Sequence, residues 1–289
     1  MRFAAYARDG KRHVGIVEGA RILPVAPLWG EPRGLRQIID GGSALTARIS
    51  EYAASVQRSE WLDLDGLELA LPIEAPGKIV CLGLNYADHA REGGHAVPDY
   101  PALFLRARTS LIAAGAALVK PRVSDMFDYE AELMVVIGAK ARHVSEQAAL
   151  DHVFGYTCFN DASVRDYQRK TAQWTPGKNF DGTGAIGPVV VTADELPPGA
   201  VGLAISCTLN GEIMQSANTS DMLVSTARAI SLLSEFMTLE PGDLIAMGTP
   251  RGVGYARRPP VWLRPGDRVE VEIEGIGVLR NRVVAEAAE

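Results

Sequence analysis

Paired cysteines, an excess of positive charge and long hydrophobic runs are all missing from this sequence of 289 residues. Its three cysteines, Cys81, Cys158 and Cys207, are widely spaced and match no zinc or redox motif, so we expect buried thiols in a reducing compartment. No apolar run approaches the ~20 residues that a membrane-spanning helix needs, and the first residues do not resemble a secretory leader. We therefore expect a cytoplasmic protein with no membrane partner.

The balance of charge argues against another class of partner. Lysine and arginine number 29 against 35 aspartates and glutamates, a net charge of −6, and no basic run stands out. Surfaces that bind nucleic acid concentrate positive charge, so we expect no nucleic-acid partner. The hydrophobic fraction of 47% and the charged fraction of 22% are typical of a globular protein with one or two domains.

The composition divides the chain into two predicted domains, residues 1–72 and 73–289. The first is a small N-terminal α/β domain, with strands over 3–6 and 13–17 and a helical stretch over about 34–57 that Gly41-Gly42 interrupts. In the second, short apolar segments punctuated by glycine and proline predict strands over residues 79–84, 102–105, 133–137, 188–192, 201–209, 268–274 and 278–284. Two helices are expected there, over about 145–154 and 220–237. Many strands and few helices favour an α+β fold or a β-roll over a doubly wound sheet.

Glu130, Glu132 and Asp161 are the candidates for a metal site. Glu130-Ala131-Glu132 leads into the predicted buried strand 133–137, and alternation along a strand puts both glutamates on one face. Adjacent carboxylates repel each other unless a positive charge lies between them. Asp161 follows a helical stretch and a second apolar segment. Three oxygen ligands without cysteine or histidine suit a hard cation such as Mg²⁺ or Mn²⁺.

Each of these acids also has an ordinary structural interpretation. A Glu-x-Glu pair on a strand is most often solvated and paired with lysine or arginine. Asp161 could be the N-cap of a short helix beginning at Ala162. The spacing alone does not decide between these interpretations and a metal site.

His89 and Glu92 form a second candidate pair, just after the predicted strand 79–84. Three residues apart on a helical turn, they would share a face, and a carboxylate beside an imidazole orients it and raises its basicity, as in a general base. Gly93-Gly94 and Pro98 indicate that this turn belongs to a mobile lid. The alternative is an exposed histidine near an acid on a loop.

Gln168 and Lys178 add polar and positive groups after Asp161. We place Gln168 on the same short helix as Asp161, and Lys178 in a loop beside Gly177. Near a divalent cation a lysine can hold an anionic substrate or a developing oxyanion. The alternative is a loop lysine in water.

One motif in this region is misleading. Gly182-Thr183-Gly184-Ala185-Ile186-Gly187 fits the dinucleotide fingerprint G-x-G-x-x-G. That fingerprint must open a helix, so that the pyrophosphate meets the helix N-terminus. Here Pro188 and a β-branched run follow, which is strand sequence. We therefore predict a glycine-rich turn and no nucleotide cofactor.

Six blocks, in order along residues 79–284, resemble the fumarylacetoacetate hydrolase family. They are Gly83-Leu84-Asn85-Tyr86-Ala87-Asp88-His89, Asp128-Tyr129-Glu130-Ala131-Glu132-Leu133, Asn160-Asp161 with Arg165-Asp166 and Gln168, Gly177-Lys178-Asn179-Phe180, Leu239-Glu240-Pro241-Gly242-Asp243, and Gly248-Thr249-Pro250 with Gly252-Val253-Gly254. The resemblance implies a mixed β-roll catalytic domain, usually dimeric, with a smaller N-terminal domain as in longer bacterial members. We therefore expect a homodimer.

The same resemblance implies roles for single residues. Glu130, Glu132 and Asp161 match the family's Mg²⁺ or Mn²⁺ ligands, and His89 with Glu92 matches its lid dyad. Lys178 is the third implied catalytic residue. The implied substrate-binding residues are Gln168, Thr249, Arg165 and Tyr86.

The sequence departs from the family pattern at three places. Arg106-Ala107 stands where many relatives have Lys-Pro, and Met247 where many have threonine. Asn85 lies in a segment where some relatives have a fourth acidic ligand. Because of the first two departures, the sequence does not determine which side chain the substrate carries. The third predicts a three-carboxylate site completed by water and substrate.

The activity implied is that of a metal-dependent hydrolase which cleaves a C–C bond in a 2,4-dioxo acid. An acylpyruvate or fumarylpyruvate, of the kind met in aromatic compound catabolism, would give pyruvate and a carboxylic acid. His89, oriented by Glu92, would deprotonate water, and Lys178 and Gln168 would stabilise the oxyanion. We expect Arg257 or Arg258, in a segment that rims the pocket, to favour a dianionic substrate.

Two other activities stay open. An oxaloacetate-type decarboxylase or a 2-hydroxy-dienedioate isomerase needs the same metal-enolate site but no nucleophilic water. A catalytically silent metal-binding or scaffold protein is the third possibility. The intact acids, the lid dyad and Lys178 argue against it.

Overall fold

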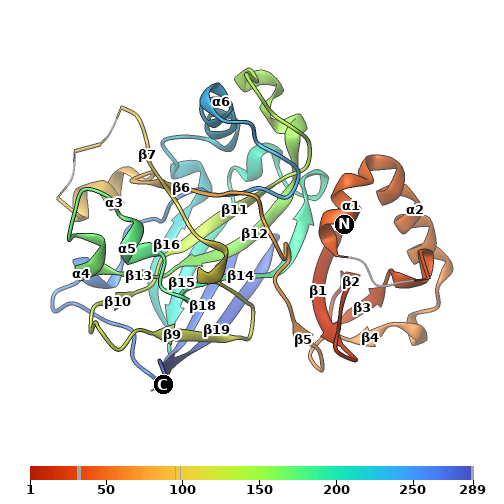
Figure 1. Ribbon diagram of the computed structural model, residues 1–289, viewed down its shortest axis with the longest axis horizontal. Coiled ribbons are helices and arrows are strands. Elements are labelled where there is room, and N and C mark those ends of the chain that lie inside the picture. The colour runs from red at the N-terminus through yellow and green to blue at the C-terminus, as the bar shows by residue number, and fades with distance from the viewer. Residues whose placement is uncertain (31–33, 95, 98, 288–289) are drawn as a thin grey trace.

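The computed structural model describes residues 1–30, 34–94, 96–97 and 99–287, which form two large β-sheets and a few short helices (Figure 1). The larger sheet runs in the order β4 (Leu62–Asp63), β3 (Arg21–Pro24), β2 (Lys11–Glu18), β1 (Arg2–Arg8), β14 (Gly184–Thr192), β12 (Val153–Asp161), β11 (Ala131–Ile137), β17 (Leu244–Ala246), β6 (Ile79–Gly83) and β7 (Ala102–Leu105). Two short strands join it on the side, β5 (Glu68–Leu69) on β1 and β8 (Leu111–Ala113) on β14.

The second sheet combines four strands from the C-terminal third of the chain with β9 from earlier in the sequence. Its order is β16 (Glu212–Asn218), β15 (Ala204–Leu209), β18 (Arg268–Ile273), β19 (Gly277–Ala285) and β9 (Ala117–Lys120). A separate pair joins β10 (Phe127–Asp128) to β13 (Ser163–Val164). The α-helices are α1 (Leu35–Asp40), α2 (Gly42–Ser55), α3 (Ala87–Glu92), α4 (Arg165–Gln168), α5 (Thr175–Lys178) and α6 (Thr226–Phe236).

The pairing is mixed, and the predicted α+β fold is confirmed. β17 pairs with β6 in parallel, as do β14 with β8 and β19 with β9, whereas the other ladders are antiparallel. The strand 268–273 alternates between exposed and buried residues, as its sequence predicts. None of the helices in the described part of the chain is long and apolar enough to cross a membrane.

β11 lies inside the protein with all its residues buried, because both faces of this part of the sheet are covered. Leu133 and Val135 pack into a core shared with the second sheet. Met134 and Val136 point the opposite way, into a core that also contains residues of α1 and α2. This continuous apolar strand fixes the position of the acids at its start.

The N-terminal segment forms a layered unit at one end of the molecule, and α3, α4 and α5 lie toward the other end (Figure 1). The predicted strands 3–6 and 13–17 lie within β1 and β2, and the helical stretch is broken where the sequence predicts, into α1 and α2. β1 also pairs with β14, so the unit extends the larger sheet. The boundary at residue 72 stays a prediction.

Two predicted helices differ in the structure. Over 145–154 the chain forms a 3-10 helix, η4 (Glu146–His152), and β12 starts directly after it. The helix predicted from 220 begins only at Thr226, because Ser225 caps it. The preceding residues form a separate 3-10 turn closed by reciprocal bonds between Asn218 and Asp221. Local side-chain capping therefore overrides the apolar periodicity that extended the prediction.

The position of Asp161 also differs from the prediction. It is the last residue of β12, and not part of a helix, whereas Gln168 lies on the separate helix α4. The N-cap of α4 is Val164, so the alternative of Asp161 as a helix N-cap is wrong. The glycine-rich segment 182–187 is strand from Gly184 onward, which agrees with the rejection of a nucleotide fingerprint but not with a turn through its whole length.

Candidate active site

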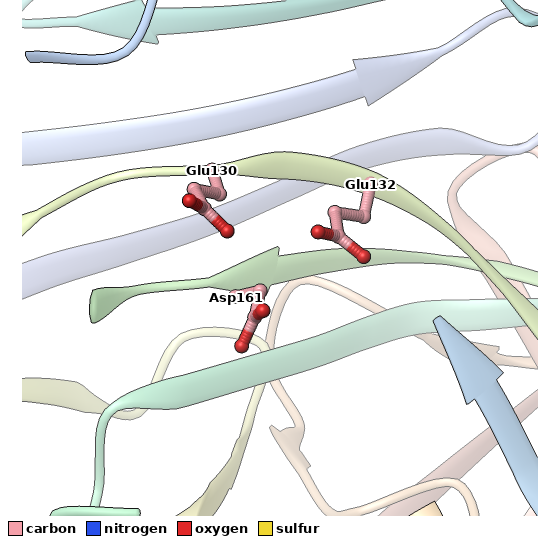
Figure 2. Close-up of side chains that lie close together, drawn as sticks. All are labelled: Glu130, Glu132 and Asp161. Carbon is pink, nitrogen blue, oxygen red and sulfur yellow. The ribbon is translucent and has the colours of Figure 1, made fainter. Parts of the chain in front are cut away.

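Glu130, Glu132 and Asp161 come together at the ends of two neighbouring strands. Glu130 and Glu132 lie on the same face, as the alternation predicts, and Figure 2 shows Asp161 projecting beside them from the adjacent strand. The antiparallel register sets Glu132 opposite Phe159, and the backbone N–H of Asp161 donates to the carbonyl of Glu130 at 2.9 Å. One ligand atom from each acid lies within 4.8 Å of the others.

Three cationic side chains offset these buried acids. The Nζ of Lys178 lies 2.7 Å from Oε2 of Glu130 and 2.7 Å from Oδ2 of Asp161. Arg165 forms an ion pair with Oε1 of Glu130 at 2.7 Å, and Arg106 donates to Oδ1 of Asp161. All these groups are buried, so the alternative of a solvated Glu-x-Glu face is wrong, although the pairing with lysine and arginine that it includes is found at Glu130.

The surroundings affect the two glutamates in opposite ways. Burial disfavours the charged form of Glu130, but the charges of Arg165 and Lys178 outweigh it and lower its pKa to about 2. Burial and the repulsion of Asp161 and Glu130 raise the pKa of Glu132 well above its usual range. Burial opposes the charge of Lys178, yet Asp161 and Glu130 raise its pKa.

Glu132 shows that these residues fit a divalent cation. It is 2% exposed, and among the described residues its carboxylate has one hydrogen bond, from the backbone N–H of Gly248 at 3.0 Å, and no ion pair. A buried carboxylate without a partner cation is costly. Glu130, Glu132 and Asp161 supply the all-oxygen donor set that Mg²⁺ and Mn²⁺ prefer.

His89 and Glu92 form the predicted pair on α3. The Nδ1 of His89 lies 2.9 Å from Oε1 of Glu92, and the Glu92 carboxylate also accepts from the backbone N–H of Gly252 at 2.9 and 3.0 Å. His89 is 7% exposed, so the alternative of an exposed loop histidine is wrong. This bonding occupies Nδ1 and leaves Nε2 for proton transfer. Pro98, which contributed to the prediction of a lid, lies outside the described residues.

A cavity of about 700 Å³ joins the pair to the acids. Its walls include most of the predicted site residues, namely His89, Glu92, Glu130, Glu132, Asp161, Arg165, Gln168, Lys178 and Thr249. Tyr86 is not among the lining residues; it is 3% exposed, and its hydroxyl has no hydrogen-bond partner among the residues described. The roles assigned to all these residues stay predictions, but nine of them face one space.

The polar residues predicted to bind substrate are held by protein partners. Thr249 accepts through Oγ1 from Nε2 of Gln215 at 2.8 Å. Arg165 donates from Nη1 to Oε1 of Gln168 at 2.9 Å and from Nε to Oδ2 of Asp128 at 2.8 Å. Such contacts fix the orientation of these side chains at the cavity wall.

Arg106, Met247 and Asn85, at the three departures from the family pattern, are buried, whereas Ala107 is exposed. Arg106 donates to Asp161, so this departure bears on a candidate metal ligand. Met247 is fully buried, and its carbonyl accepts from the Asn85 amide at 2.8 Å. The Asn85 side chain also bonds both backbone groups of Val224, which explains its place in the fold without a metal.

The two arginines expected at the rim differ. Arg258 lines the cavity, together with its neighbours Tyr255 and Ala256. Arg257 does not line this cavity, and donates to the backbone carbonyls of Met214 and Gly252 at 2.6 and 3.3 Å. Only Arg258 therefore keeps the predicted position.

Asp128 and Arg169 are site residues that the sequence interpretation missed. Asp128 is fully buried and accepts from Arg165, from the N–H of Gly254 at 2.7 Å and from that of Tyr255 at 3.1 Å. It thus ties α4 to the cavity rim. Arg169 lines the cavity, with its guanidinium 4.4 Å from the centre of the Tyr255 ring. Asp128 is the first residue of the family-like block that contains Glu130 and Glu132, and its place there was the signal in the sequence that could have identified it.

The fold and the site together define an α+β protein with a buried three-carboxylate cluster and a histidine–glutamate pair in one cavity. The family model described as "Fumarylacetoacetate (FAA) hydrolase C-terminal" matches residues 78–284. The chain belongs to the fumarylacetoacetate hydrolase family and is an enzyme of that superfamily.

Similar proteins fall into more than one class of activity. The human "Oxaloacetate tautomerase FAHD2A, mitochondrial" is 40% identical over 255 residues, 88% of this chain and 80% of that protein. A fumarylacetoacetate hydrolase structure from Exiguobacterium antarcticum has a TM-score of 0.86 at 35% identity, covering 99% of this chain and all of the other. Maleylpyruvate hydrolase from Sphingobium sp. SYK-6, in complex with manganese(II) and pyruvate, has a TM-score of 0.83 at 29% identity, with the same coverage.

Proposed function

We propose that this enzyme acts on a dianionic 2-oxo acid through its enolate, and that its reaction is the keto–enol tautomerisation of an oxaloacetate-type substrate with Mg²⁺ or Mn²⁺. The observation that carries the proposal is that the His89–Glu92 pair and the three-carboxylate cluster line the same cavity. Tautomerisation is preferred over hydrolysis because the human tautomerase is 40% identical over most of both chains.

A divalent cation held by Glu130, Glu132 and Asp161 would supply a Lewis acid that lowers the energy of an enolate. Proton transfer would belong to His89. With Nδ1 held by Glu92, its Nε2 would take the proton from carbon 3 of the substrate and return it to the 2-oxygen. No atom is lost, and the pair returns to its starting state.

The charges along the cavity favour two carboxylates in the substrate. Lys178 would stabilise negative charge on the reacting oxygen. Arg169 and Arg258 line the same cavity and do not pair with the three acids, so they would meet the distal carboxylate. The hypothesis that an arginine at the pocket rim favours a dianionic substrate is thereby extended from Arg258 to Arg169.

Hydrolysis of a 2,4-dioxo acid is the second candidate. The specific observation in its favour is the same His89–Glu92 pair, which would activate water in place of a substrate C–H bond. The similar maleylpyruvate hydrolase, whose structure holds manganese(II) and pyruvate, supports this alternative.

One experiment separates the two reactions. The loss of the enol absorbance of oxaloacetate, and the release of pyruvate from acetylpyruvate and fumarylpyruvate, are followed with Mg²⁺, with Mn²⁺ and with EDTA. Metal-dependent enol–keto conversion that His89→Gln abolishes and Asp88→Asn keeps would support tautomerisation; Asp88 lies on the same helix and is exposed. Pyruvate release without enol–keto conversion would show instead that the enzyme is a hydrolase. If the enzyme shows neither enol–keto conversion nor pyruvate release, the proposal is overturned.

A homodimer and a cytoplasmic location are also proposed, on the family resemblance and the sequence respectively. Light scattering on the purified chain tests the first and cell fractionation the second. A monomer at working concentrations would contradict the dimer.

A further inference from the structure

In each acid of the cluster formed by Glu130, Glu132 and Asp161, one carboxylate oxygen is occupied by a donor of the surrounding protein. Oδ1 of Asp161 accepts from Arg106, Oε1 of Glu130 pairs with Arg165 at 2.7 Å, and Oε2 of Glu132 accepts from the N–H of Gly248 at 3.0 Å. The second oxygens of Glu130 and Asp161 both lie 2.7 Å from Nζ of Lys178. These second oxygens therefore converge, while the first ones are engaged elsewhere.

The guanidinium of Arg106 is held in place by further hydrogen bonds besides the one to Asp161. Its side chain is 0% exposed, and Nε donates to Ser110 at 3.1 Å while Nη2 donates to Thr183 at 2.9 Å. Nη1, which donates to Asp161, also donates to the backbone carbonyl of Ala162 at 3.3 Å. A Cβ at Gly184 would lie only 2.8 Å from Nη2, so a side chain there would displace the guanidinium from its present position. The surroundings fix Arg106, and through it the rotation of the Asp161 carboxylate.

We propose that Arg106 is a positioning residue that restricts Asp161 to one ligating oxygen and so makes the site select Mg²⁺ and Mn²⁺ over Ca²⁺. The inference rests on the metal site of the proposed function and not on the substrate. Ca²⁺ takes roughly six to eight oxygens and readily uses bidentate carboxylates, whereas Mg²⁺ requires near-octahedral coordination. Three single oxygens from the cluster suit an octahedral ion completed by water and substrate, whereas Ca²⁺ would have to take most of its roughly six to eight oxygens from water and would gain little from the site.

The chemistry of arginine explains why lysine would not do the same. Its planar fork donates in several fixed directions at once, whereas an ammonium is a point charge on a flexible stem. Arg106 uses that fork to reach Asp161, Ser110 and Thr183 together. A lysine there, as in many relatives, would keep the charge but lose the simultaneous contacts to Ser110 and Thr183, so it would fix the rotation of the Asp161 carboxylate less firmly.

The test measures metal binding on the full chain without substrate. Dissociation constants for Mn²⁺ are obtained by electron paramagnetic resonance, and those for Ca²⁺ by competition, in the wild type, Arg106→Lys and Arg106→Gln. Arg169→Gln is the control, because it removes a positive charge from the cavity wall without a contact to the acids. In both Arg106 variants the Mn²⁺ constant should rise by roughly 10- to 100-fold, the usual cost of losing a partner that orients a ligand. The Ca²⁺ constant should rise less, so the ratio of the Ca²⁺ to the Mn²⁺ constant should fall. In Arg169→Gln the ratio should not change.

Several outcomes would overturn the inference. Equal changes in both constants would mean that Arg106 acts through its charge alone, and a wild type that binds Ca²⁺ as tightly as Mn²⁺ would remove the selectivity itself. If both Arg106 variants fail to fold, Thr183→Val removes one contact of Nη2, and the ratio should then fall by a smaller factor; an unchanged ratio counts against the inference. Lack of turnover with every 2-oxo acid, with metal selectivity as expected, would overturn only the proposed function.

Discussion

Lys178 is 2% exposed and touches two of the three carboxylates of the cluster, which makes it the central cation of the site. Burial alone would favour the neutral amine, but the pKa of Lys178 is raised because Asp161 and Glu130 stabilise the ammonium more than burial penalises it. The side chain therefore carries a fixed positive charge at neutral pH. A fixed charge costs no reorganisation when negative charge develops on a substrate.

Lys178→Ala should lower kcat far more than it raises KM. The loss of one such donor typically costs roughly 3–4 kcal/mol of transition-state stabilisation. Steady-state kinetics on the substrate that the enzyme turns over best would measure the two constants separately. Lys140→Ala, which changes an exposed lysine, serves as the control. Near-normal kcat in Lys178→Ala would remove Lys178 from the mechanism.

Glu92→Gln should reduce kcat by roughly 100-fold or more, the lower end of what general acid–base catalysis contributes. The amide keeps the shape of the side chain beside His89 and Gly252 but loses the negative charge that stabilises the imidazolium. The pH profile of kcat, compared with that of Asp88→Asn, measures the effect. An unchanged profile and rate would show that the pair does not transfer the proton.

Single residues of the site were predictable from sequence only where a local rule applies. The shared face of Glu130 and Glu132 follows from strand alternation, and the His89–Glu92 contact from helical spacing. Arg106 bonds Asp161 across 55 positions in the chain, and Arg165 bonds Asp128 across 37. No periodicity encodes contacts of that kind, because they depend on how the strands pair.

At the scale of the elements, the register between β11 and β12 brings the three acids of the candidate metal site together. β12 continues to Asp161 because it is paired on both sides, with β11 and with β14. The sequence interpretation predicted no strand here, only an apolar segment over residues 153–159 that stops short of Asn160 and Asp161. The last polar residues of a strand are hard to recognise locally, and here they include the candidate ligand.

Ser225→Ala should destabilise the protein by about 1 kcal/mol, because α6 loses the hydroxyl that accepts from the N–H of Arg228 at 3.2 Å. Urea denaturation followed by circular dichroism would measure the free energy of unfolding. Ser216→Ala, at an exposed position of β16, is the matched control. Equal stability of the two variants would contradict the assigned cap.

At the scale of the whole molecule, the proposed cation site would couple cation binding to folding. Glu130, Glu132 and Asp161 come together only when β11 and β12 pair, so a cation binds the folded chain in preference to the unfolded one. Mn²⁺ at about a hundred times its Kd should therefore stabilise the fold by about 2.7 kcal/mol. Thermal unfolding with EDTA and with Mn²⁺ would show the shift. The same shift in Asp161→Asn would place the ion elsewhere.

The N-terminal unit also closes an open edge. β14 lies beside the strand that ends in Asp161, and two separate strands cover its other side: β8 over Gly184–Ile186, and β1 at Val190 and Val191. Without residues 1–72, part of β14 would present free N–H and C=O groups, and the apolar surface of Met134 and Val136 would lose its cover. Unpaired strand edges of this kind are templates for aggregation. A chain without residues 1–72 would keep every candidate catalytic residue but would tend to precipitate. The N-terminal unit would thus keep the catalytic domain from aggregating, in addition to completing the larger sheet.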